Sequence, residues 1–260
     1  MLAVIPAAGL GTRLLPGTKS VPKELHPVRG KPAIQWVLEE AVDAGLYEFV
    51  VVVNSYKFIL KHYLTPLGPR HPLRGRPELE DFERLLREIR LTFVDQDTPK
   101  GLGHAILQCR KLIRDRPFAL LLPDNVFPEG TRVLRNLLKV WDQHAMSCTV
   151  LRHAKPVSSG GFVTTPIDEH IHRIDSVVPK GNPQASEMDI RNIGRCIFDP
   201  EAMIYLEEAW ARTDTELDEV PAFTGLAAQG RLLGMFTDEE VYHLGETPLH
   251  SVSENESVCR

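Results

Sequence analysis

Glycines and cations near the N-terminus are the residues with the clearest chemical potential. An apolar run, Leu2 to Pro6, leads into a turn with Gly9 and Gly11, which is followed by Arg13 and Lys23. Glycine has no Cβ, so such a turn can be tight and approach a ligand closely, and its backbone amides can surround an anion. Arginine offers a planar fork of donors to phosphate oxygens, and lysine offers a compact charge. The pattern predicts a phosphate-binding turn.

The two commonest phosphate-binding loops match this turn poorly. A dinucleotide fingerprint needs a third glycine where the chain has Leu14, and an acidic residue after the next apolar strand, which ends in Asn54. A P-loop needs Gly-Lys followed by Ser or Thr, which this stretch lacks. A glycine turn after a strand can also be a plain connection. The nearby Arg13 and Lys23 argue against that interpretation.

Strands alternating with helices are expected to position the turn. Apolar patterning predicts strands at 2–6, 49–53, 91–94 and 118–122, and helices at 33–44, 56–64, 78–89 and 103–113. This alternation predicts an α/β fold with a doubly wound, mostly parallel (mixed) sheet between two helical layers, with ligands at the carboxyl ends of the strands. Beyond residue 126 the pattern is less regular and predicts a helix at 131–144, a strand at 147–152, a hairpin at 160–174 and a helix at 200–210.

Composition excludes several classes of function. The 260 residues are 43% hydrophobic, enough for a sizeable core, and the net charge of −5 without a long basic run argues against a nucleic-acid partner. No apolar run reaches the roughly 20 residues that span a bilayer, and the apolar N-terminus lacks the basic start of a signal peptide. Four cysteines without CxxC spacing argue against a zinc site and a disulfide framework. We therefore expect a reduced, cytoplasmic protein with no membrane partner.

Three segments give the chain a resemblance to sugar nucleotidyltransferases. They read GLGTR at Gly9–Arg13, PKE at Pro22–Glu24 and GLGHA at Gly101–Ala105. In type and order they resemble most closely the bacterial UTP:glucose-1-phosphate uridylyltransferase family. The resemblance implies a Rossmann-like nucleotide-diphospho-sugar transferase fold in one domain over residues 1–250. Residues 1–130 would be its nucleotide-binding half and 131–250 its sugar-binding half, followed by a polar tail at 251–260.

The resemblance also implies which residues meet the nucleotide. They are Ala8, Gly9, Gly11, Thr12, Gln96, Gly101 and Gly103. The amide of Gln96 has both a donor and an acceptor for the edge of uracil, and Gly101 and Gly103 would let the base lie against backbone. Residues 100–103 can equally be the loop that opens the next helix, and both interpretations can hold together.

Asp124 is the candidate for a metal ion. It follows a buried strand and Pro123, and a carboxylate there suits Mg²⁺, a hard cation that prefers oxygen ligands. An aspartate after a strand also often caps a turn. The resemblance favours Asp124 as a ligand of the metal ion. It also implies that Asp124 contacts the sugar. At the second metal-binding aspartate of the family this chain has His243, a poor Mg²⁺ ligand, so the acidic residues at 238–240 stay open as alternatives.

Lys180 is the third catalytic candidate besides Arg13 and Lys23. In VVPKG, which resembles the family's VVEKP, Lys180 would neutralise the sugar phosphate or the α-phosphate, with Lys23 on the other side and Arg13 on the β- and γ-phosphates. Pro179 replaces the glutamate expected to hold sugar hydroxyls. Sugar contacts are implied for Gly161, Asp218 and Glu219, in segments that match the family only in part.

The resemblance implies a nucleotidyltransferase that condenses UTP with a sugar-1-phosphate, by default glucose-1-phosphate. In-line attack assisted by Mg²⁺ would give a UDP-sugar and pyrophosphate, mainly through positioning and charge stabilisation. One alternative is a different sugar or base such as dTTP, which Pro179 favours. The other is a degenerate nucleotide-binding regulatory protein, which His243 favours. The resemblance also implies a homo-oligomer.

Overall fold

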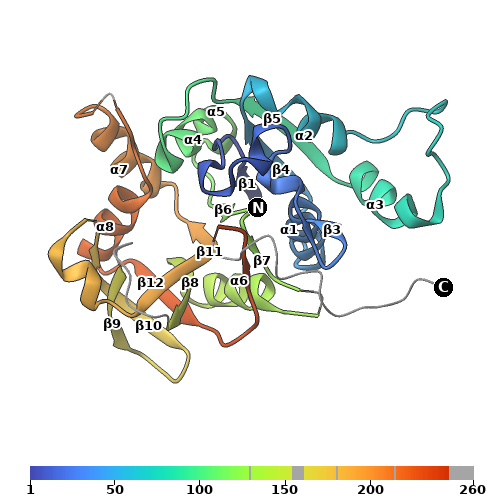
Figure 1. The fold of residues 1–260 in the computed structure, drawn as a ribbon. Helices are drawn as coiled ribbons and strands as arrows, with labels where there is room; N and C mark the ends of the chain where they lie inside the picture. The colour runs from blue at the N-terminus through green and yellow to red at the C-terminus, as the bar shows by residue number, and fades with distance from the viewer. Residues whose placement is uncertain (129, 154–160, 180, 214, 246–260) are drawn as a thin grey trace.

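The fold is built on a nine-stranded sheet drawn from nearly the whole chain (Figure 1). The computed structural model describes residues 1–128, 130–153, 161–179, 181–213 and 215–245. Across the sheet the strands follow the order β5 (Arg90–Asp95), β4 (Glu48–Val53), β1 (Leu2–Pro6), β6 (Phe118–Leu121), β11 (Ile190–Phe198), β8 (Ser147–His153), β12 (Leu232–Phe236), β10 (Ile171–Val178) and β9 (Gly161–Pro166). Both halves predicted from the sequence contribute strands to it.

The sheet is mixed, and most of its parallel pairs come from the N-terminal half of the chain. Pairing is parallel from β5 through β4 and β1 to β6, and again between β8 and β12. The other neighbours pair antiparallel. Because parallel strands end at one edge, the segments that follow β1, β5 and β6 lie close together.

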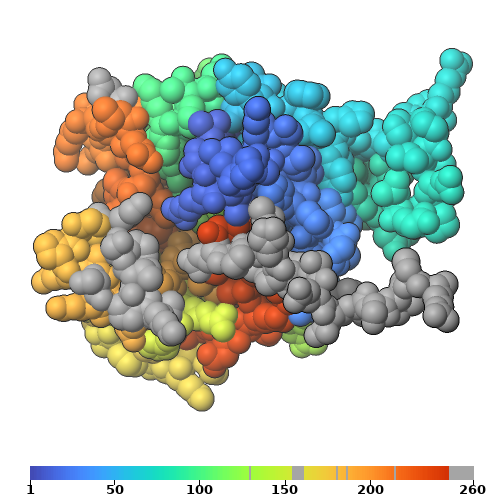
Figure 2. Space-filling model, in the orientation of Figure 1, coloured from blue at the N-terminus to red at the C-terminus, as the bar shows by residue number. Residues whose placement is uncertain are grey.

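Helices cover both faces of the sheet, so the doubly wound, three-layer fold class is confirmed. One face packs against α1 (Ala33–Asp43), α2 (Phe58–Tyr63), α3 (Pro77–Glu88) and α6 (Val133–His144). The other face packs against α4 (Leu102–Gln108), α5 (Arg110–Ile113), α7 (Glu201–Trp210) and α8 (Val220–Ala228). The segment that contains α3 projects from the body of the molecule (Figures 1 and 2).

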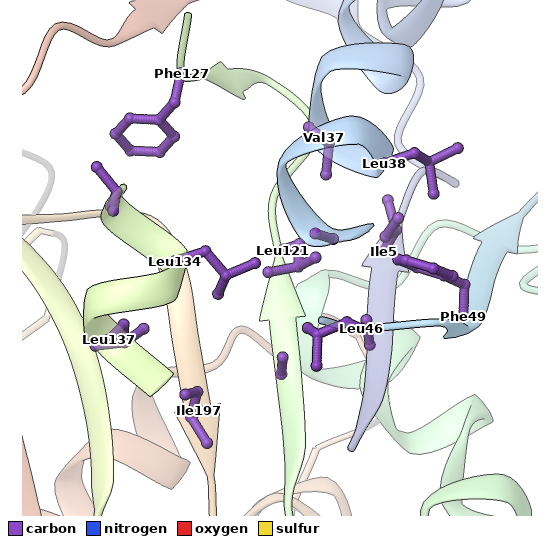
Figure 3. Packing of buried hydrophobic residues seen from close by; sticks show 14 of the residues in the cluster. Ile5, Val37, Leu38, Leu46, Phe49, Leu121, Phe127, Leu134, Leu137 and Ile197 are labelled. Carbon is purple, nitrogen blue, oxygen red and sulfur yellow. The ribbon is translucent and has the colours of Figure 1, made fainter. Parts of the chain in front are cut away.

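Side chains of the central strands alternate between these two layers. In β1, Ala3 and Ile5 belong to the core beneath α1, whereas Leu2 and Val4 belong to the opposite core. Figure 3 shows the first core, where Ile5 and Leu121 from neighbouring strands lie beside α1. Burial on both faces explains why these strands are continuous apolar runs in the sequence.

Two short strand pairs flank the edge where β1 and β6 end. β2 (Pro27–Val28) pairs with β3 (Lys31–Pro32), and β7 (Asn125–Val126) pairs with β13 (Tyr242–His243). The second pair brings the C-terminal part of the described chain to the segment that follows β6.

In the second half, the sequence patterns missed β11, β12 and α8, together with a 3₁₀ turn at Pro183–Glu187 and the short strand β13. Arg195 and Gly194 interrupt the apolar run of β11, and α8 contains Pro221 and Gly225, which ordinarily weaken a helix. In the first half, the helix predicted at 103–113 divides at Cys109 into α4 and α5, and that predicted at 56–64 begins with a 3₁₀ turn at Ser55–Lys57.

Other expectations from the composition concern thiols and membranes. Cys109, Cys148 and Cys196 are buried free thiols, while Cys259 and the tail at 251–260 lie outside the described residues. Among the helices that the structure describes, none combines the length and the apolar character needed to cross a bilayer.

A buried arginine ties β11 to the segment after β6. The Arg195 side chain is fully buried, and its Nε and Nη2 donate to Oε2 of Glu40 in α1 at 2.9 and 2.7 Å. Nη1 donates to the carbonyl of Leu122 at 3.1 Å and Nη2 to that of Asn125 at 3.0 Å. These bonds hold both ends of the turn that contains Asp124.

We predict that Arg195→Met lowers the free energy of unfolding by about 3–5 kcal/mol, because it leaves Glu40 buried without its cation. The double variant Arg195→Met/Glu40→Leu should lose less than the sum of the single variants. Urea denaturation measures all three. The control is Arg173→Met, which removes a half-exposed ion pair with Asp175 and should cost at most about 1 kcal/mol. Equal losses for Arg195→Met and this control would contradict the prediction.

Candidate functional site

A cavity of about 300 Å³ lies at the carboxyl ends of β1, β5 and β6. Pro6 ends β1, Gln96 directly follows β5, and Leu122 to Asp124 directly follow β6. Of the residues predicted from the sequence, the lining includes Ala8, Gly9, Lys23, Gln96, Gly101 and Asp124. The structure therefore gathers six predicted residues around one space, although they come from four separate segments of the chain.

The N-terminal turn is held by hydrogen bonds to its neighbours. The Asn54 side chain, just past β4, donates to the carbonyl of Ala8 at 2.5 Å. Gly11 adopts φ +67°, a left-handed conformation that favours glycine, and its carbonyl accepts a 2.8 Å bond from the Thr18 hydroxyl. The turn is thus shaped before any ligand arrives.

Thr12 and Arg13 lie outside the cavity lining. They belong to a 3₁₀ turn at Thr12–Leu14, where both are exposed. A Cβ on Gly245 would lie 3.7 Å from Nη1 of Arg13, so the guanidinium is beside the segment that follows β13. Arg13 is therefore placed to approach a ligand from outside the cavity.

Lys23 and Asp124, predicted to have separate roles, are in direct contact. The Lys23 ammonium donates to Oδ2 of Asp124 at 2.7 Å, with side chains 21% and 37% exposed. Burial raises the pKa of Asp124, but the charge and hydrogen bond of Lys23 outweigh it, and nearby His243 adds to their effect. The net pKa lies below its usual value, so Asp124 is an anion at neutral pH.

A second, buried ion pair supports Lys23 from behind. Lys57, before α2, donates to both carboxylate oxygens of Glu24 at 2.8 and 2.9 Å, with side chains 7% and 0% exposed. Burial lowers the pKa of Lys57, against the opposing effect of the Glu24 charge. Since Glu24 is the residue next to Lys23, this pair fixes the 3₁₀ turn at Lys23–Leu25 against the end of β4.

Gly101 and Gly103 face protein backbone, which gives them a packing role besides the nucleotide contact that we expect. A Cβ on Gly101 would overlap the carbonyl oxygen of Leu217, and one on Gly103 would overlap that of Asp218. Two backbone bonds join the same segments, from the Leu217 amide to Lys100 at 2.9 Å and from the His104 amide to Leu217 at 3.3 Å. The glycines therefore let two distant segments pack closely, and only Gly101 also lines the cavity.

Asp218 and Glu219 stand at the start of α8. The carboxylate of exposed Asp218 accepts from the Val220 amide at 3.1 Å, as a local cap. Burial raises the pKa of half-buried Glu219 to about 7, and the charges of Asp218 and Asp124 add to that rise. Glu219, in the second half of the chain, is thus close enough to Asp124, in the first half, for the two negative charges to affect each other.

The other predicted residues differ in how far the structure describes them. His243 pairs with Asn125 in the short β7–β13 ladder, and the Leu244 amide donates to the carbonyl of Asp124 at 3.0 Å. Buried Gly161 is the first residue of β9 and pairs with Val178 of β10. Val178 stands two residues before Lys180 in the chain. Lys180 itself lies outside the described residues.

Asp124 is the predicted residue that best suits a metal ion here. Asp124 offers a carboxylate at the cavity, which suits a hard divalent cation that also takes phosphate oxygens and water. The imidazole of His243 does not suit Mg²⁺. Within the part of the chain that the structure describes, no group of three or more His, Cys, Asp or Glu could hold a metal ion.

Several residues of the site carried too little signal to be chosen from the sequence. Glu216 lines the cavity, yet it lies in an irregular polar stretch. Lys57 and Asn54 follow the end of β4, where Lys57 binds Glu24 and Asn54 binds the carbonyl of Ala8. In the sequence, the VVVVN segment indicates only that this strand has no acidic residue at its end. His104 is part of the GLGHA segment, and its Nδ1 contacts the side-chain amide of Gln96.

We predict that Gly103→Ala lowers the free energy of unfolding by about 1–3 kcal/mol, because its methyl group must displace backbone at Asp218. Chemical denaturation measures the change. Gly68→Ala is the control, since nothing lies within 4 Å of a Cβ there, and it should change stability by about 0.5 kcal/mol or less. Similar values for both variants would show that the contact at Gly103 is not tight.

We predict that Glu219 contributes a pH-dependent stability relative to Glu219→Gln. Its pKa is raised from 4.5 to about 7 in the fold, so its favourable contribution is present below about pH 4.5 and is lost as pH rises through about 7. The stability of the wild type minus that of the variant should fall between pH 5 and pH 8. Thermal unfolding across this range measures it, with Glu208→Gln on the exposed side of α7 as control. A flat difference would refute the assigned environment.

Comparison with known proteins places these features in a family. The model of the nucleotidyl transferase family matches residues 2–240. The chain is 34% identical over 239 residues to a UTP-glucose-1-phosphate uridylyltransferase of Pseudomonas aeruginosa, covering 88% of this chain and 86% of the relative. It is 31% identical over 251 residues to the Bacillus subtilis enzyme of the same name, covering 94% and 86%.

Solved structures agree with the sequence relatives. A UDP-glucose pyrophosphorylase complexed with UDP-glucose superposes with a TM-score of 0.84 at 26% identity, covering 94% of this chain and 93% of that one. An apo UDP-glucose pyrophosphorylase superposes with a TM-score of 0.85 at 28% identity and the same coverage. The chain therefore belongs to the nucleotidyl transferase family and, within it, to the family of the UTP-glucose-1-phosphate uridylyltransferases.

Proposed function

We propose that the protein is a nucleotidyltransferase that condenses UTP with glucose-1-phosphate, giving UDP-glucose and pyrophosphate. The observation that carries this proposal is the contact of Lys23 with Asp124 on the wall of the cavity. A cation for phosphate and a carboxylate for a metal ion stand there beside the glycine turn that follows β1. Relatives at 34% and 31% identity bear the name of this activity.

The chain's own residues would act by positioning and by charge. The turn around Gly9 and Gly11 would hold the triphosphate through backbone amides, with Arg13 on the β- and γ-phosphates. Lys23 would stabilise the charge that develops on the α-phosphate when the sugar phosphate attacks in line. Lys180 is proposed for the sugar-phosphate side. No covalent intermediate with the protein is needed, because orientation and charge stabilisation suffice for this chemistry.

Asp124 would hold a divalent cation, for which we propose Mg²⁺. Held there, a divalent ion would supply positive charge against the phosphates of the nucleotide. Lys23 occupies only Oδ2 of Asp124 in the structure, and Oδ1 makes no side-chain bond to another described residue. The charge of this carboxylate interacts with both His243 and Glu219.

Gly161, Asp218 and Glu219 are proposed for the sugar side. Pro179 offers no side-chain hydrogen bond to the hydroxyls of a sugar, and this single observation keeps a different sugar-1-phosphate or a different base as the second candidate. The buried free thiols are consistent with a reducing compartment, and we propose a cytoplasmic protein. A homo-oligomer is proposed by analogy with the family.

The function is tested by pyrophosphate release from a matrix of nucleoside triphosphates and sugar-1-phosphates with Mg²⁺, repeated with EDTA. Release with UTP and glucose-1-phosphate, abolished by EDTA, is the expected result. Release with another pair would support the second candidate. No release, with UTP binding retained, would support a degenerate nucleotide-binding protein.

We predict that Lys23→Ala lowers kcat by about 10²–10³-fold, the usual loss when a donor to transition-state charge is removed. The KM for the sugar phosphate should change far less. Steady-state kinetics measure both, and thermal unfolding checks the fold of the variant. Lys19→Ala is the control, because Lys19 is exposed on the same loop and lies outside the cavity lining. Equal losses in kcat and in sugar-phosphate affinity would contradict the proposed role.

A further inference from the structure

The side-chain amide of Gln96 has a defined orientation. Its Nε2 lies 3.1 Å from the carbonyl oxygen of Gly101, and a carbonyl can only accept. The nitrogen of the amide must therefore point to Gly101. The same Nε2 lies 2.8 Å from Nδ1 of His104.

These two contacts determine the state of His104. An amide nitrogen donates two hydrogen bonds and accepts none, so Nδ1 of His104 must be an unprotonated acceptor and the ring must be the neutral Nε2–H tautomer. Burial and the nearby Lys100 charge lower the pKa of His104, in agreement with a neutral ring.

The imidazole ring is held in place from three sides. Nε2 of His104 lies 3.1 Å from Nε2 of Gln108, one turn along α4. Because this tautomer makes Nε2 of His104 a donor, the exposed side-chain amide of Gln108 must turn by half a rotation and present its oxygen to the ring. The ring lies against Trp210 of α7, with centroids 4.7 Å apart, and the Lys100 ammonium lies 5.2 Å from the centroid of the same Trp210 ring. The acceptor at Nδ1 is therefore rigidly placed.

Both hydrogens of the Gln96 amide are thus engaged within the protein. Gln96 is 4% exposed and lines the cavity, and its Oε1 makes no hydrogen bond to another described residue. A ligand in the cavity consequently meets an acceptor at this position and no donor. A glutamine free to rotate about its last bond could offer either group, so the restriction comes from His104 and Gly101.

We propose that His104 is a positioning residue that determines base specificity. By accepting from Nε2 of Gln96, it keeps Oε1 toward the cavity, so that among pyrimidines the site selects one with a ring N–H, such as uracil or thymine. Cytosine would present a ring lone pair to Oε1, and two acceptors would face each other. This inference rests on the proposed function, in that a nucleoside triphosphate must occupy the cavity.

The test compares the binding of UTP and CTP, by calorimetry, to the wild type and to two variants of similar shape. His104→Asn keeps an acceptor where Nδ1 was, whereas His104→Leu has none. The wild type and His104→Asn should prefer UTP by about 10-fold or more, the usual cost of an unpaired polar group at a buried site. His104→Leu should reduce that preference to about 3-fold or less.

His144→Leu, on an exposed histidine at the end of α6, is the matched control and should keep the preference of the wild type. Preference retained in His104→Leu would overturn the inference. So would equal loss in His104→Asn and His104→Leu, because packing alone would then explain both. No UTP binding by the wild type would overturn the proposed function and this inference with it, whereas the other two outcomes leave the function standing.

A measurement on the wild type keeps the inference testable even where His104→Leu does not fold. Long-range ¹H–¹⁵N NMR spectra distinguish the two neutral tautomers of a histidine ring. The expected signal for His104 is that of Nε2–H with an unprotonated Nδ1. A proton on Nδ1 at neutral pH would overturn the inference, because Nδ1 could not then accept from Gln96.

Discussion

The position of Asp124 depends on the buried guanidinium of Arg195. This arginine donates to Glu40 on α1 and to the carbonyls of Leu122 and Asn125, on either side of Asp124. Burying a cation away from water costs free energy unless each of its N–H groups donates a hydrogen bond. Here the requirement is met by backbone carbonyls that would otherwise need other partners. The same bonds that satisfy Arg195 therefore impose the path of the turn.

Burial also separates two ion pairs beside the proposed phosphate position. Glu24 and Lys57 neutralise each other behind the 3₁₀ turn, and Lys23 and Asp124 pair in front of it at the cavity. The inner pair is shielded from water, so it serves mainly to hold the turn in place. The outer pair is partly exposed, so Lys23 and Asp124 are accessible to the phosphate and the metal ion that we propose for them. Rigid support and exchangeable charge are thus divided between neighbouring residues.

The two halves of the chain pack against each other at Gly101 and Gly103. Because Gly101 and Gly103 have no side chain, the backbone around Leu217 can reach the start of α4 and place Glu219 near Asp124. The same segment, from Gln96 to His104, then forms the wall where a base is proposed to lie. Close packing between the halves and orientation of the Gln96 amide are consequently properties of one short stretch of chain.

Local patterns in the sequence were enough to predict the first half of the fold. Apolar runs such as 2–6, 49–53 and 118–122 are buried on both faces, and this leaves a continuous signal. β11 and α8 gave no such signal, because the polar or helix-weakening residues in them are stabilised by distant partners. Arg195 finds Glu40, and Gly225 packs against the ring of Tyr205.

The sequence by itself determined the candidate residues of the site, and the tertiary structure decided how they are combined. The turn from Gly9 to Arg13 is local, so its predicted capacity to hold phosphate follows from residue types and spacing. The pairing of Lys23 with Asp124, and of Glu24 with Lys57, joins residues far apart in the chain. Such contacts are set by the order in which the strands pair and by which buried charges must be neutralised. These are properties of the folded whole that no single segment of the sequence contains.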